Sequence, residues 1–328
     1  MNDTLLACFQ AAPGEYVSGE KLSRELGISR TAVWKRIRRL EESGYRFESV
    51  PRLGYKLIGY PDRLRPEELL PRLAGTRFGA SVKLYDSLES TQNAAYEALV
   101  HGAGEGALIV ADAQTSGRGR LGRHWFSPPG KGIYMSFLLQ PNVPLARAPQ
   151  MTLLLSVAMC RAIRRSIGAD ATIKWPNDIL IGGRKVCGIL VETILEADAV
   201  KAMIAGIGVS ANVGRDEFPE ALRPIATSLM EAAGARVSRE AVIGEFFEQF
   251  EALYELYRSD GFEPVKTLWE ALSSTLHGRV RVNTPQGVAE GVAEGITTEG
   301  ALLVRDDAGV VHTMYSGDLS APAVSLPT

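Results

Sequence analysis

Gln114-Thr-Ser-Gly-Arg-Gly-Arg-Leu-Gly-Arg-His-Trp-Phe-Ser-Pro-Pro-Gly130 is the stretch of this sequence that constrains the fold most. Gly117, Gly119 and Gly122 have the G-x-G-x-x-G spacing of a dinucleotide-binding turn. Such a turn must open a helix, and Ser127-Pro128-Pro129 follows too closely to allow one. It is not a Walker A loop either, because Arg123-His124 stand where Lys and Ser or Thr are required. The stretch therefore predicts a glycine-rich loop of another kind.

Arg118, Arg120 and Arg123 give this loop its chemistry. Glycines let backbone amides approach an anion closely, and arginines supply forked donors to a phosphate or a carboxylate. A basic surface loop without a ligand would have a similar composition, but it would not explain the embedded aromatic pair Trp125-Phe126. The pattern therefore favours an anion-binding loop.

The sequence around the loop alternates between helical and strand patterns. We expect helices at 66–73, 91–100, 147–167 and 238–257, and strands at 82–86, 107–111, 133–139, 172–175, 186–193 and 202–209. Some strands are joined by hairpin-length links, such as 178–181 to Lys185 through Gly182-Gly183. Short strands with such links favour a mixed α+β sheet over a doubly wound parallel one.

The N-terminal part has the pattern of a winged helix-turn-helix, with helices expected at 5–12, 19–26 and 30–43 and strands at 45–50 and 55–58. Val33, Ile37 and Leu40 share one face of the third helix, and the rest of its surface is basic. Such a face can simply be solvated, but the caps, the turn and the hairpin all occur in order. We therefore expect DNA contacts from Ser18, Ser29, Arg30, Thr31, Trp34, Lys35 and Arg38.

The C-terminal part is rich in valine and glycine, with strands expected at 279–282, 288–296, 301–305 and 310–315. Short strands with tight turns indicate a small SH3-like barrel. We therefore expect an α+β multidomain protein with domains at residues 1–62, 63–272 and 273–328.

Composition limits the class of protein further. The 328 residues are 45% hydrophobic and 23% charged, and the net charge of −2 means that any nucleic-acid surface must be local. Cys8, Cys160 and Cys187 form neither a disulfide set nor a metal-ligand spacing. The N-terminus lacks the pattern of a signal peptide, and the apolar run 151–160 is too short for a membrane span. We expect a cytoplasmic protein without a membrane partner.

Two further motifs, Lys174-Trp-Pro-Asn-Asp178 and Gly183-Arg-Lys-Val-Cys-Gly-Ile-Leu-Val-Glu192, complete a recognisable set. Together with the glycine-rich loop, they resemble the biotin–protein ligase family, in its long bacterial form that doubles as the biotin operon repressor. The resemblance covers nearly the whole chain. It implies a winged helix-turn-helix, a mixed α+β catalytic domain like those of the class II synthetase-like biotin and lipoate ligases, and the SH3-like domain.

The resemblance also implies an activity. The family activates biotin with ATP and Mg²⁺ to biotinyl-5'-AMP and transfers biotin to a lysine of a biotin carboxyl carrier protein, such as that of acetyl-CoA carboxylase. The adenylate is then both the intermediate and the corepressor. The implied partners are this carrier, operator DNA and, with ligand bound, a second copy of the chain in a homodimer.

Matching the family's motifs residue by residue implies individual roles. The catalytic residues would be Lys185, Arg118 and Arg120. Biotin would be bound by Ser90, Thr91, Gln92, Gln114, Arg118, Gly119, Arg120, Trp125, Lys185, Gly188, Gly206 and Gly208. The nucleotide would be bound by Arg120, Arg123, Lys174, Asn177, Asp178, Ser210 and Asn212, with Asp178 near the metal. Ser210 is a departure, because the family usually has asparagine there.

The residue types agree with this chemistry. Joining a carboxylate to the α-phosphate of ATP brings two anions together, which arginines, a lysine and Mg²⁺ must offset. Two other hypotheses stay open at this point. One is a lipoate–protein ligase with the same adenylate chemistry, against which the DNA-binding module and the Gly-Arg-Gly-Arg loop argue. The other is a non-catalytic biotin-sensing transcription factor, against which the intact Lys185, Arg118 and Arg120 argue.

Overall fold

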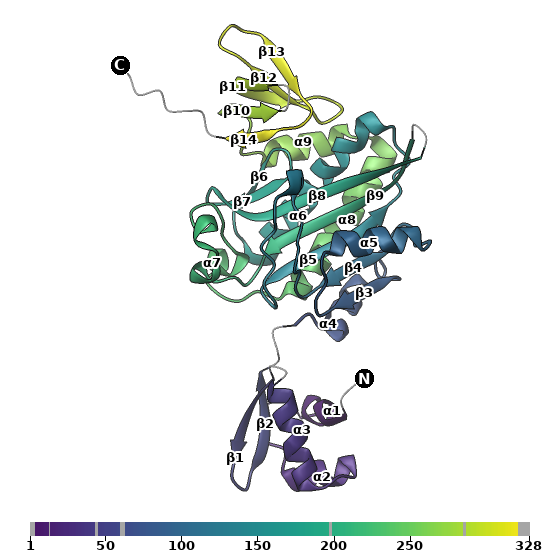
Figure 1. Cartoon of the computed structure of the whole chain (residues 1–328), viewed down its shortest axis with the longest axis vertical. Helices are drawn as coiled ribbons and strands as arrows, with labels where there is room; N and C mark the ends of the chain where they lie inside the picture. The colour runs from purple at the N-terminus through teal and green to yellow at the C-terminus, as the bar shows by residue number, and fades with distance from the viewer. Residues whose placement is uncertain are drawn as a thin grey trace, which may run out of the picture. The chain divides into compact units, whose positions relative to one another are not determined.

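A computed structural model describes residues 4–12, 14–42, 45–59, 63–196, 199–284 and 287–320. By their internal contacts they form two compact units, Met1–Arg63 and Leu64–Thr328 (Figure 1). The expected boundary at residue 62 falls on Asp62, which lies outside the described residues. No described helix combines the length and the apolar character that a membrane span needs.

The first unit contains α1 (Thr4–Gln10), α2 (Gly19–Leu26) and α3 (Arg30–Glu42), followed by the hairpin of β1 (Arg46–Val50) and β2 (Gly54–Gly59). The Ser18 hydroxyl caps α2 by accepting a hydrogen bond from the Lys21 amide, and Ser29 caps α3 in the same way at Ala32. The predicted core face of α3 is confirmed, because Val33, Ile37 and Leu40 are all buried. Its predicted last residue, Ser43, lies outside the described residues. The order of elements is that of a helix-turn-helix followed by a hairpin.

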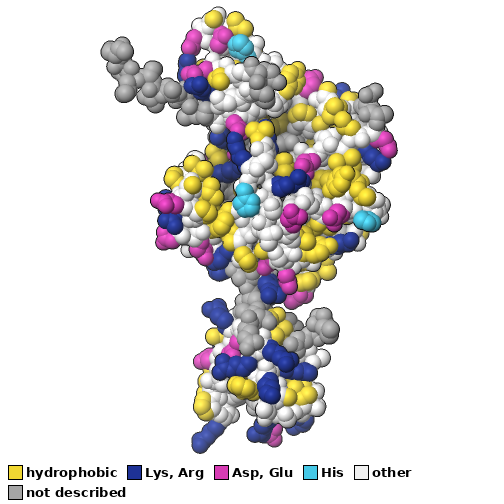
Figure 2. All heavy atoms as spheres, in the orientation of Figure 1, with side chains coloured by type: hydrophobic (Ala, Val, Ile, Leu, Met, Phe, Trp, Pro, Cys, Tyr) yellow, Lys and Arg dark blue, Asp and Glu magenta, His cyan; other side chains and the backbone are white. Residues whose placement is uncertain are grey.

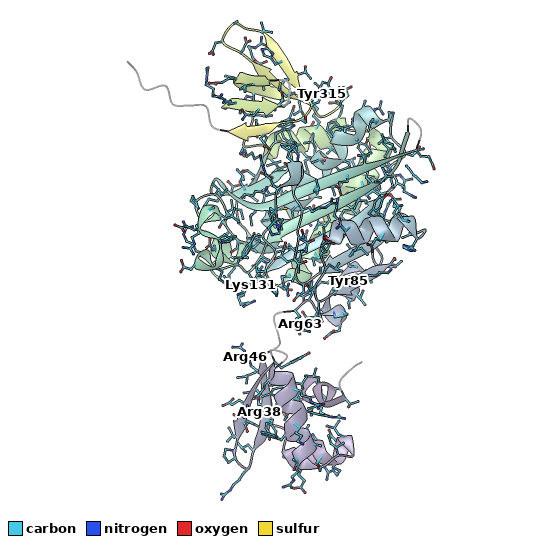
Figure 3. All side chains as sticks on the ribbon, in the orientation of Figure 1. Arg38, Arg46, Arg63, Tyr85, Lys131 and Tyr315 are labelled. Carbon is cyan, nitrogen blue, oxygen red and sulfur yellow. The ribbon has the colours of Figure 1, made fainter. Side chains whose placement is uncertain are left out.

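A seven-stranded sheet forms the centre of the second unit, in the order β3-β4-β5-β9-β8-β7-β6. β3 pairs with β4 in parallel, and the other neighbours are antiparallel, so the predicted mixed sheet is confirmed. Tyr85, at the end of the edge strand β3, is partly exposed (Figure 3). The strands are β3 (Val82–Tyr85), β4 (Leu108–Ala111), β5 (Gly132–Leu139), β6 (Ala171–Lys174), β7 (Asp178–Ile181), β8 (Arg184–Glu196) and β9 (Ala199–Ser210).

Helices cover both faces of this sheet. The large core lies between the sheet and α6 (Ala148–Ile167), α8 (Arg239–Asp260) and α9 (Glu263–Leu272). A smaller apolar cluster packs α5 (Thr91–Val100) on the other side, in front of the sheet in Figure 1. Helix α9 was not predicted, although Val265 and Trp269 have helical spacing and are buried. Shorter helical elements are α4 (Pro66–Leu73), α7 (Leu229–Ala233), η1 (Arg120–Gly122), η2 (Leu145–Arg147), η3 (Arg215–Glu217) and η4 (Glu220–Leu222).

The C-terminal strands form an antiparallel sheet in the order β13-β12-β11-β10-β14. They are β10 (Arg279–Thr284), β11 (Gly287–Ile296), β12 (Leu302–Arg305), β13 (Val311–Met314) and β14 (Asp318–Ser320). The last of these strands lies beyond the predicted ones. Val282, Ala293 and Leu302 belong to the same core as α6 and α9. This shared core explains why the small β domain stays within the second compact unit.

Candidate active site and candidate DNA-binding surface

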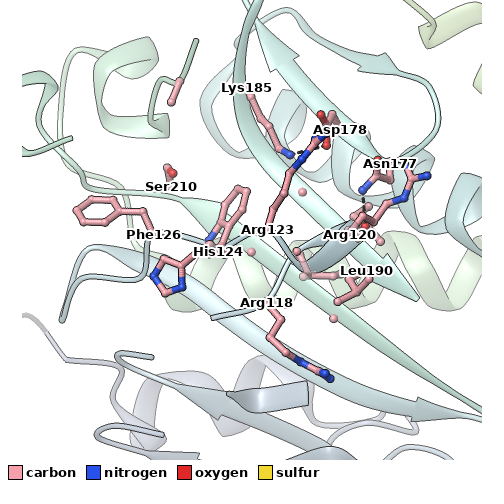
Figure 4. Close-up of a pocket in the computed structure, with 18 of the residues that line it drawn as sticks. Arg118, Arg120, Arg123, His124, Phe126, Asn177, Asp178, Lys185, Leu190 and Ser210 are labelled. Carbon is pink, nitrogen blue, oxygen red and sulfur yellow. Dashed lines mark hydrogen bonds and ion pairs between the residues drawn. The ribbon is translucent and has the colours of Figure 1, made fainter. Parts of the chain in front are cut away.

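A cavity of about 480 Å³ opens on the sheet beside the glycine-rich loop (Figure 4). Its walls come from that loop, the β7–β8 hairpin, β9 and a later segment that includes Phe218 and Ala226. Nearly all of the ligand-contacting residues expected from the sequence line it: Ser90, Thr91, Gln92, Gln114, Arg118, Gly119, Arg120, Arg123, Trp125, Lys174, Asn177, Asp178, Lys185, Gly188, Gly206, Gly208 and Ser210. Residues that are far apart in the chain therefore share one cavity.

One part of the cavity wall is a network of buried neutral hydrogen bonds at the start of α5. The Thr91 amide donates to Gln114 Oε1 at 2.8 Å, and the Thr91 and Ser136 hydroxyls lie 2.9 Å apart. Ser136 in turn donates to Gln92 Oε1 at 2.7 Å. Ser90 begins this helix as its N-cap. These groups are held before any ligand arrives, which suits the recognition of a neutral polar group.

Two glycines of β9 are required by close packing against this wall. A Cβ at position 206 would lie 2.5 Å from Gln92 Oε1, and a Cβ at position 208 would lie 2.6 Å from the Trp125 indole. Real Cβ atoms essentially never make contacts that short, so a side chain at either position would have to displace the Gln92 amide or the Trp125 ring. Trp125 Nε1 is buried and has no hydrogen-bond partner among the described residues. A donor of this kind needs an acceptor, and a ligand in the cavity could supply it.

The glycine-rich loop folds back on itself. The Gly119 amide donates to the Arg123 carbonyl, and the Trp125 amide donates to the Gly117 carbonyl, both at 2.8 Å. A Cβ on Gly117 would meet the Ser127 hydroxyl at 2.6 Å, so this turn also requires glycine. The turn brings Trp125 under the Lys185 ammonium, with Nζ 5.3 Å from the ring centroid.

Lysine and arginine side chains line other parts of the cavity wall. Lys185 Nζ lies 2.6 Å from Asp178 Oδ1, and Arg120 donates to Asn177 Oδ1 at 3.1 Å (Figure 4). Burial of the Arg120 guanidinium lowers its pKa. The remaining cations also have partners: Arg118 pairs with Glu192, Arg123 with Asp318, and Lys174 with the Leu319 carbonyl. Several positive charges that face one cavity make it attractive to a polyanion.

Asn212 is the exception among the expected ligand residues, because it does not line the cavity. Its side chain accepts a hydrogen bond from the Val237 amide and donates one to the Val237 carbonyl, both at 3.0 Å. It is 2% exposed. A nucleotide contact from Asn212 is therefore not supported by this geometry, whereas Ser210 does face the cavity.

Several cavity residues were not predicted from the sequence. Ser136 had a signal, since it is a polar residue within the otherwise apolar, fully buried strand β5. The local sequence pattern gave no signal for Asp318, nor for four apolar residues of the cavity, Phe218, Leu222, Pro224 and Ile225. They reach the cavity through long-range pairing, such as the bridge between Lys185 and Ala226. Spacing along the sequence does not predict such contacts.

A metal held by protein ligands alone is not supported. Over the described ranges, no group of three or more His, Cys, Asp or Glu side chains is placed to hold an ion. Two carboxylates line the cavity: Asp178 lies beside Lys185, and Asp318 pairs with Arg123. Such a set fits the way Mg²⁺ usually binds with a nucleotide, through one or two carboxylates and the phosphates.

The first unit offers a basic surface on α3. Arg30, Thr31, Trp34, Lys35 and Arg38 are all exposed along this helix. Trp34 is 48% exposed, and the Arg38 guanidinium lies over its ring, 5.6 Å from the centroid. Lys and Arg side chains gather over this unit in Figure 2, and Arg38 and Arg46 are labelled on it in Figure 3. An exposed basic helix with an aromatic side chain fits a DNA groove.

Other expected DNA contacts already have structural roles. The Ser18 and Ser29 hydroxyls act as helix caps, and Arg30 forms an ion pair with Glu20 at 2.7 Å. Arg38 likewise forms an ion pair with Glu41 at 3.1 Å, so Thr31, Trp34 and Lys35 are the better candidates for direct contact with DNA.

Models of three protein families match the chain. They are the HTH domain at residues 3–56, the Biotin/lipoate A/B protein ligase family at 84–210, and the Biotin protein ligase C terminal domain at 278–320. Among curated proteins, the bifunctional ligase/repressor BirA of Bacillus subtilis is 43% identical over 96% of this chain and 97% of its own. That of Escherichia coli is 31% identical over 94% of each chain.

Solved structures agree with these matches. The biotin protein ligase from Aquifex aeolicus, in complex with biotin and ATP, superimposes with a TM-score of 0.64 and 29% identity. The match covers 74% of this chain and 98% of that one. With its three domain matches in order and relatives aligned along almost its whole length, the chain belongs to the biotin protein ligase family, in the form that carries an N-terminal helix-turn-helix domain.

Proposed function

We propose that this protein activates biotin with ATP, transfers it to a lysine of a biotin carrier protein, and represses biotin genes when biotinyl-5'-AMP is bound. The observation that carries the proposal is the make-up of the cavity. One part of the cavity wall is a network of fixed neutral hydrogen bonds around Thr91 and Gln92. Other parts of the same wall carry the cations Arg118, Arg120 and Lys185. Biotin has a neutral ureido group and a carboxylate at its two ends, and ATP brings the phosphates.

In the first step a biotin carboxylate oxygen attacks the α-phosphorus of ATP. The new bond joins that oxygen to phosphorus, and the bond to the bridging oxygen breaks, so that its electron pair leaves with pyrophosphate. Lys185 would lie between the two reacting anions, exchanging its contact with Asp178 for them. Arg118, Arg120 and Arg123 would offset the charge that moves onto the leaving group.

The individual contacts follow from where each residue lies. Ser90, Thr91, Gln92 and Gln114 would hold the ureido end of biotin, with Trp125 packing beside it and donating its free Nε1–H. Arg120, Arg123, Lys174, Asn177 and Ser210 would contact the nucleotide. Asp178 would hold Mg²⁺ together with the phosphates, and the ion would supply further positive charge there.

In the second step, a lysine amine of the carrier attacks the acyl carbon of the adenylate. The bond to AMP breaks, and AMP leaves as an amide forms. A mixed anhydride is sensitive to water, so the loop with Arg118 and Arg120 would cover it until the carrier arrives. The carrier we propose is a biotin carboxyl carrier protein, such as that of acetyl-CoA carboxylase.

Repression would use the exposed face of α3. A single recognition helix covers half of a palindromic site, so tight binding requires two copies of the chain. We propose that biotinyl-5'-AMP promotes a homodimer, and that the dimer binds an operator with two half-sites.

Incubation with biotin, ATP and Mg²⁺, followed by mass spectrometry of a carrier domain, tests the ligase proposal. We expect one lysine to gain the mass of biotin, only when ATP and Mg²⁺ are both present. Labelling with lipoate but not biotin would change the substrate to that of a lipoate ligase. Tight biotin binding without labelling would instead indicate a sensor that is not an enzyme.

A further inference from the structure

Lys185 lies at an irregularity of its strand. The pairing of β7 with β8 joins Ile179 to Cys187 but Leu180 to Lys185, so Val186 is an extra residue in the ladder. Such a bulge disrupts the local ladder and re-aims neighbouring groups. Lys185 lies opposite Leu180 in this ladder and also pairs with a later segment: its amide donates to the Ile225 carbonyl at 2.8 Å, and its carbonyl accepts from the Thr227 amide at 2.9 Å. That segment therefore sets where Lys185 stands.

Glu231, in the short helix α7, forms hydrogen bonds to both strands of the pairing between Lys185 and residues 225–227. Its Oε2 accepts a hydrogen bond from the Thr227 hydroxyl at 2.9 Å and another from Arg184 Nη1 at 3.4 Å. Thr227 belongs to the bridging segment, and Arg184 is the chain neighbour of Lys185. The Glu231 side chain is 16% exposed, so water competes little for these bonds.

We propose that Glu231 is a positioning residue for Lys185, acting through Thr227 and Arg184. It does not line the cavity itself. The Lys185 ammonium lies beside Asp178 and over the Trp125 ring, within reach of the anions that it would contact in the first step, so a shift of its backbone would move the charge off the reacting phosphate. This inference rests on the proposed function, in which that charge lies between the biotin carboxylate and the phosphate.

The expected effect is on rate. A misplacement of about 1 Å at a reacting group can lower a rate by up to about 100-fold. The charge of Lys185 contributes most in the transition state, when negative charge moves onto pyrophosphate. An interaction that strengthens in the transition state appears in kcat, whereas uniform binding appears in KM.

The test uses Glu231→Ala in the full chain. The rate of biotinyl-adenylate formation is measured with saturating Mg²⁺ over a range of biotin and ATP concentrations, which gives the maximal rate and KM, and hydrogen exchange is measured at the Lys185 amide. We expect the rate to fall by about 10- to 100-fold, with KM for biotin and ATP little changed and faster exchange at Lys185. Glu231→Gln keeps an acceptor oxygen for Thr227 and Arg184, so it should restore most of the rate and the protection.

Glu251→Ala is the matched control. Glu251 is also a partly buried carboxylate, which accepts a hydrogen bond from the Arg77 amide at 2.8 Å, but it lies outside the cavity lining. This variant should keep both the rate and the exchange at Lys185.

Three results would overturn the inference: an unchanged rate in Glu231→Ala, an equal loss in Glu251→Ala, or a rise in KM alone. If the unmodified chain forms no adenylate, the proposed function fails instead. Exchange at Lys185 then still decides whether Glu231 holds that backbone, and unchanged exchange in Glu231→Ala would show that it does not.

Discussion

Gly206→Ala should weaken biotin binding by displacing Gln92. Gly206 lies in β9 opposite Ser136 of β5 and Leu190 of β8, so its backbone is held on both sides. A Cβ at this position would lie 2.5 Å from Gln92 Oε1 and 3.3 Å from the Leu190 carbonyl oxygen. The sheet cannot yield without losing its register, so the Gln92 side chain must move.

The size of the effect follows from the bonds that Gln92 makes. Restoring ordinary contact requires a shift of roughly 1 Å, because carbon contacts are favourable only near 3.5 Å and beyond. That shift breaks the bond from Ser136 at 2.7 Å and the bond to the Ile204 carbonyl at 3.1 Å. At about 1 kcal/mol net for each buried hydrogen bond, the loss is about 2 kcal/mol. A displaced Gln92 amide no longer presents this network to biotin, and an equal loss of about 2 kcal/mol at the ligand corresponds to about 30-fold weaker binding.

Isothermal titration of biotin into the variant measures this loss directly. Gly104→Ala is the matched control, since a Cβ at Gly104 meets nothing within 4 Å and the residue does not need a left-handed φ. The control should bind biotin like the unmodified chain. A Gly206→Ala variant with unchanged affinity would refute the assignment of Gln92 to the biotin site, and equal weakening in both variants would refute the steric argument.

The other predictions concern catalysis, stability and repression. Lys185→Ala should slow adenylate formation by about 100- to 1,000-fold, as for other charges aimed at a reacting centre; Arg120→Gly should instead release free adenylate, detected by chromatography. Glu217 has a lowered pKa because it accepts from the Gly214 amide and pairs with Lys131. Glu217→Gln should therefore lower Tm at neutral pH, with the difference lost as the pH falls through the lowered pKa of Glu217; a difference that does not shrink as the pH falls would contradict this. Biotinyl-5'-AMP should promote dimers in sedimentation experiments, and by thermodynamic linkage it should strengthen operator binding to the same extent. Equal DNA affinity with and without the adenylate would show that the adenylate does not control DNA binding. Deleting residues 1–60 should abolish operator binding in a gel-shift assay while carrier labelling continues.

The sequence by itself determined the features that depend on local pattern. The buried face of α3 follows from helical periodicity at Val33, Ile37 and Leu40. The mixed sheet follows from short strands with hairpin links such as Gly182-Gly183. Local motifs carried the resemblance to the biotin–protein ligase family, and that resemblance implied most of the expected cavity residues. These are short-range properties, so one chain segment contains the whole signal.

The tertiary structure decided which distant segments meet. It placed Asp318 of β14 against Arg123 and paired Ala226 with Lys185, and the local spacing of the sequence indicates neither contact. It also showed that Asn212, close in sequence to Ser210, binds Val237 while Ser210 faces the cavity. The physical reason is that backbone pairing and side-chain packing across long sequence separations decide where a residue points. Residue type alone indicates only what it could bind there.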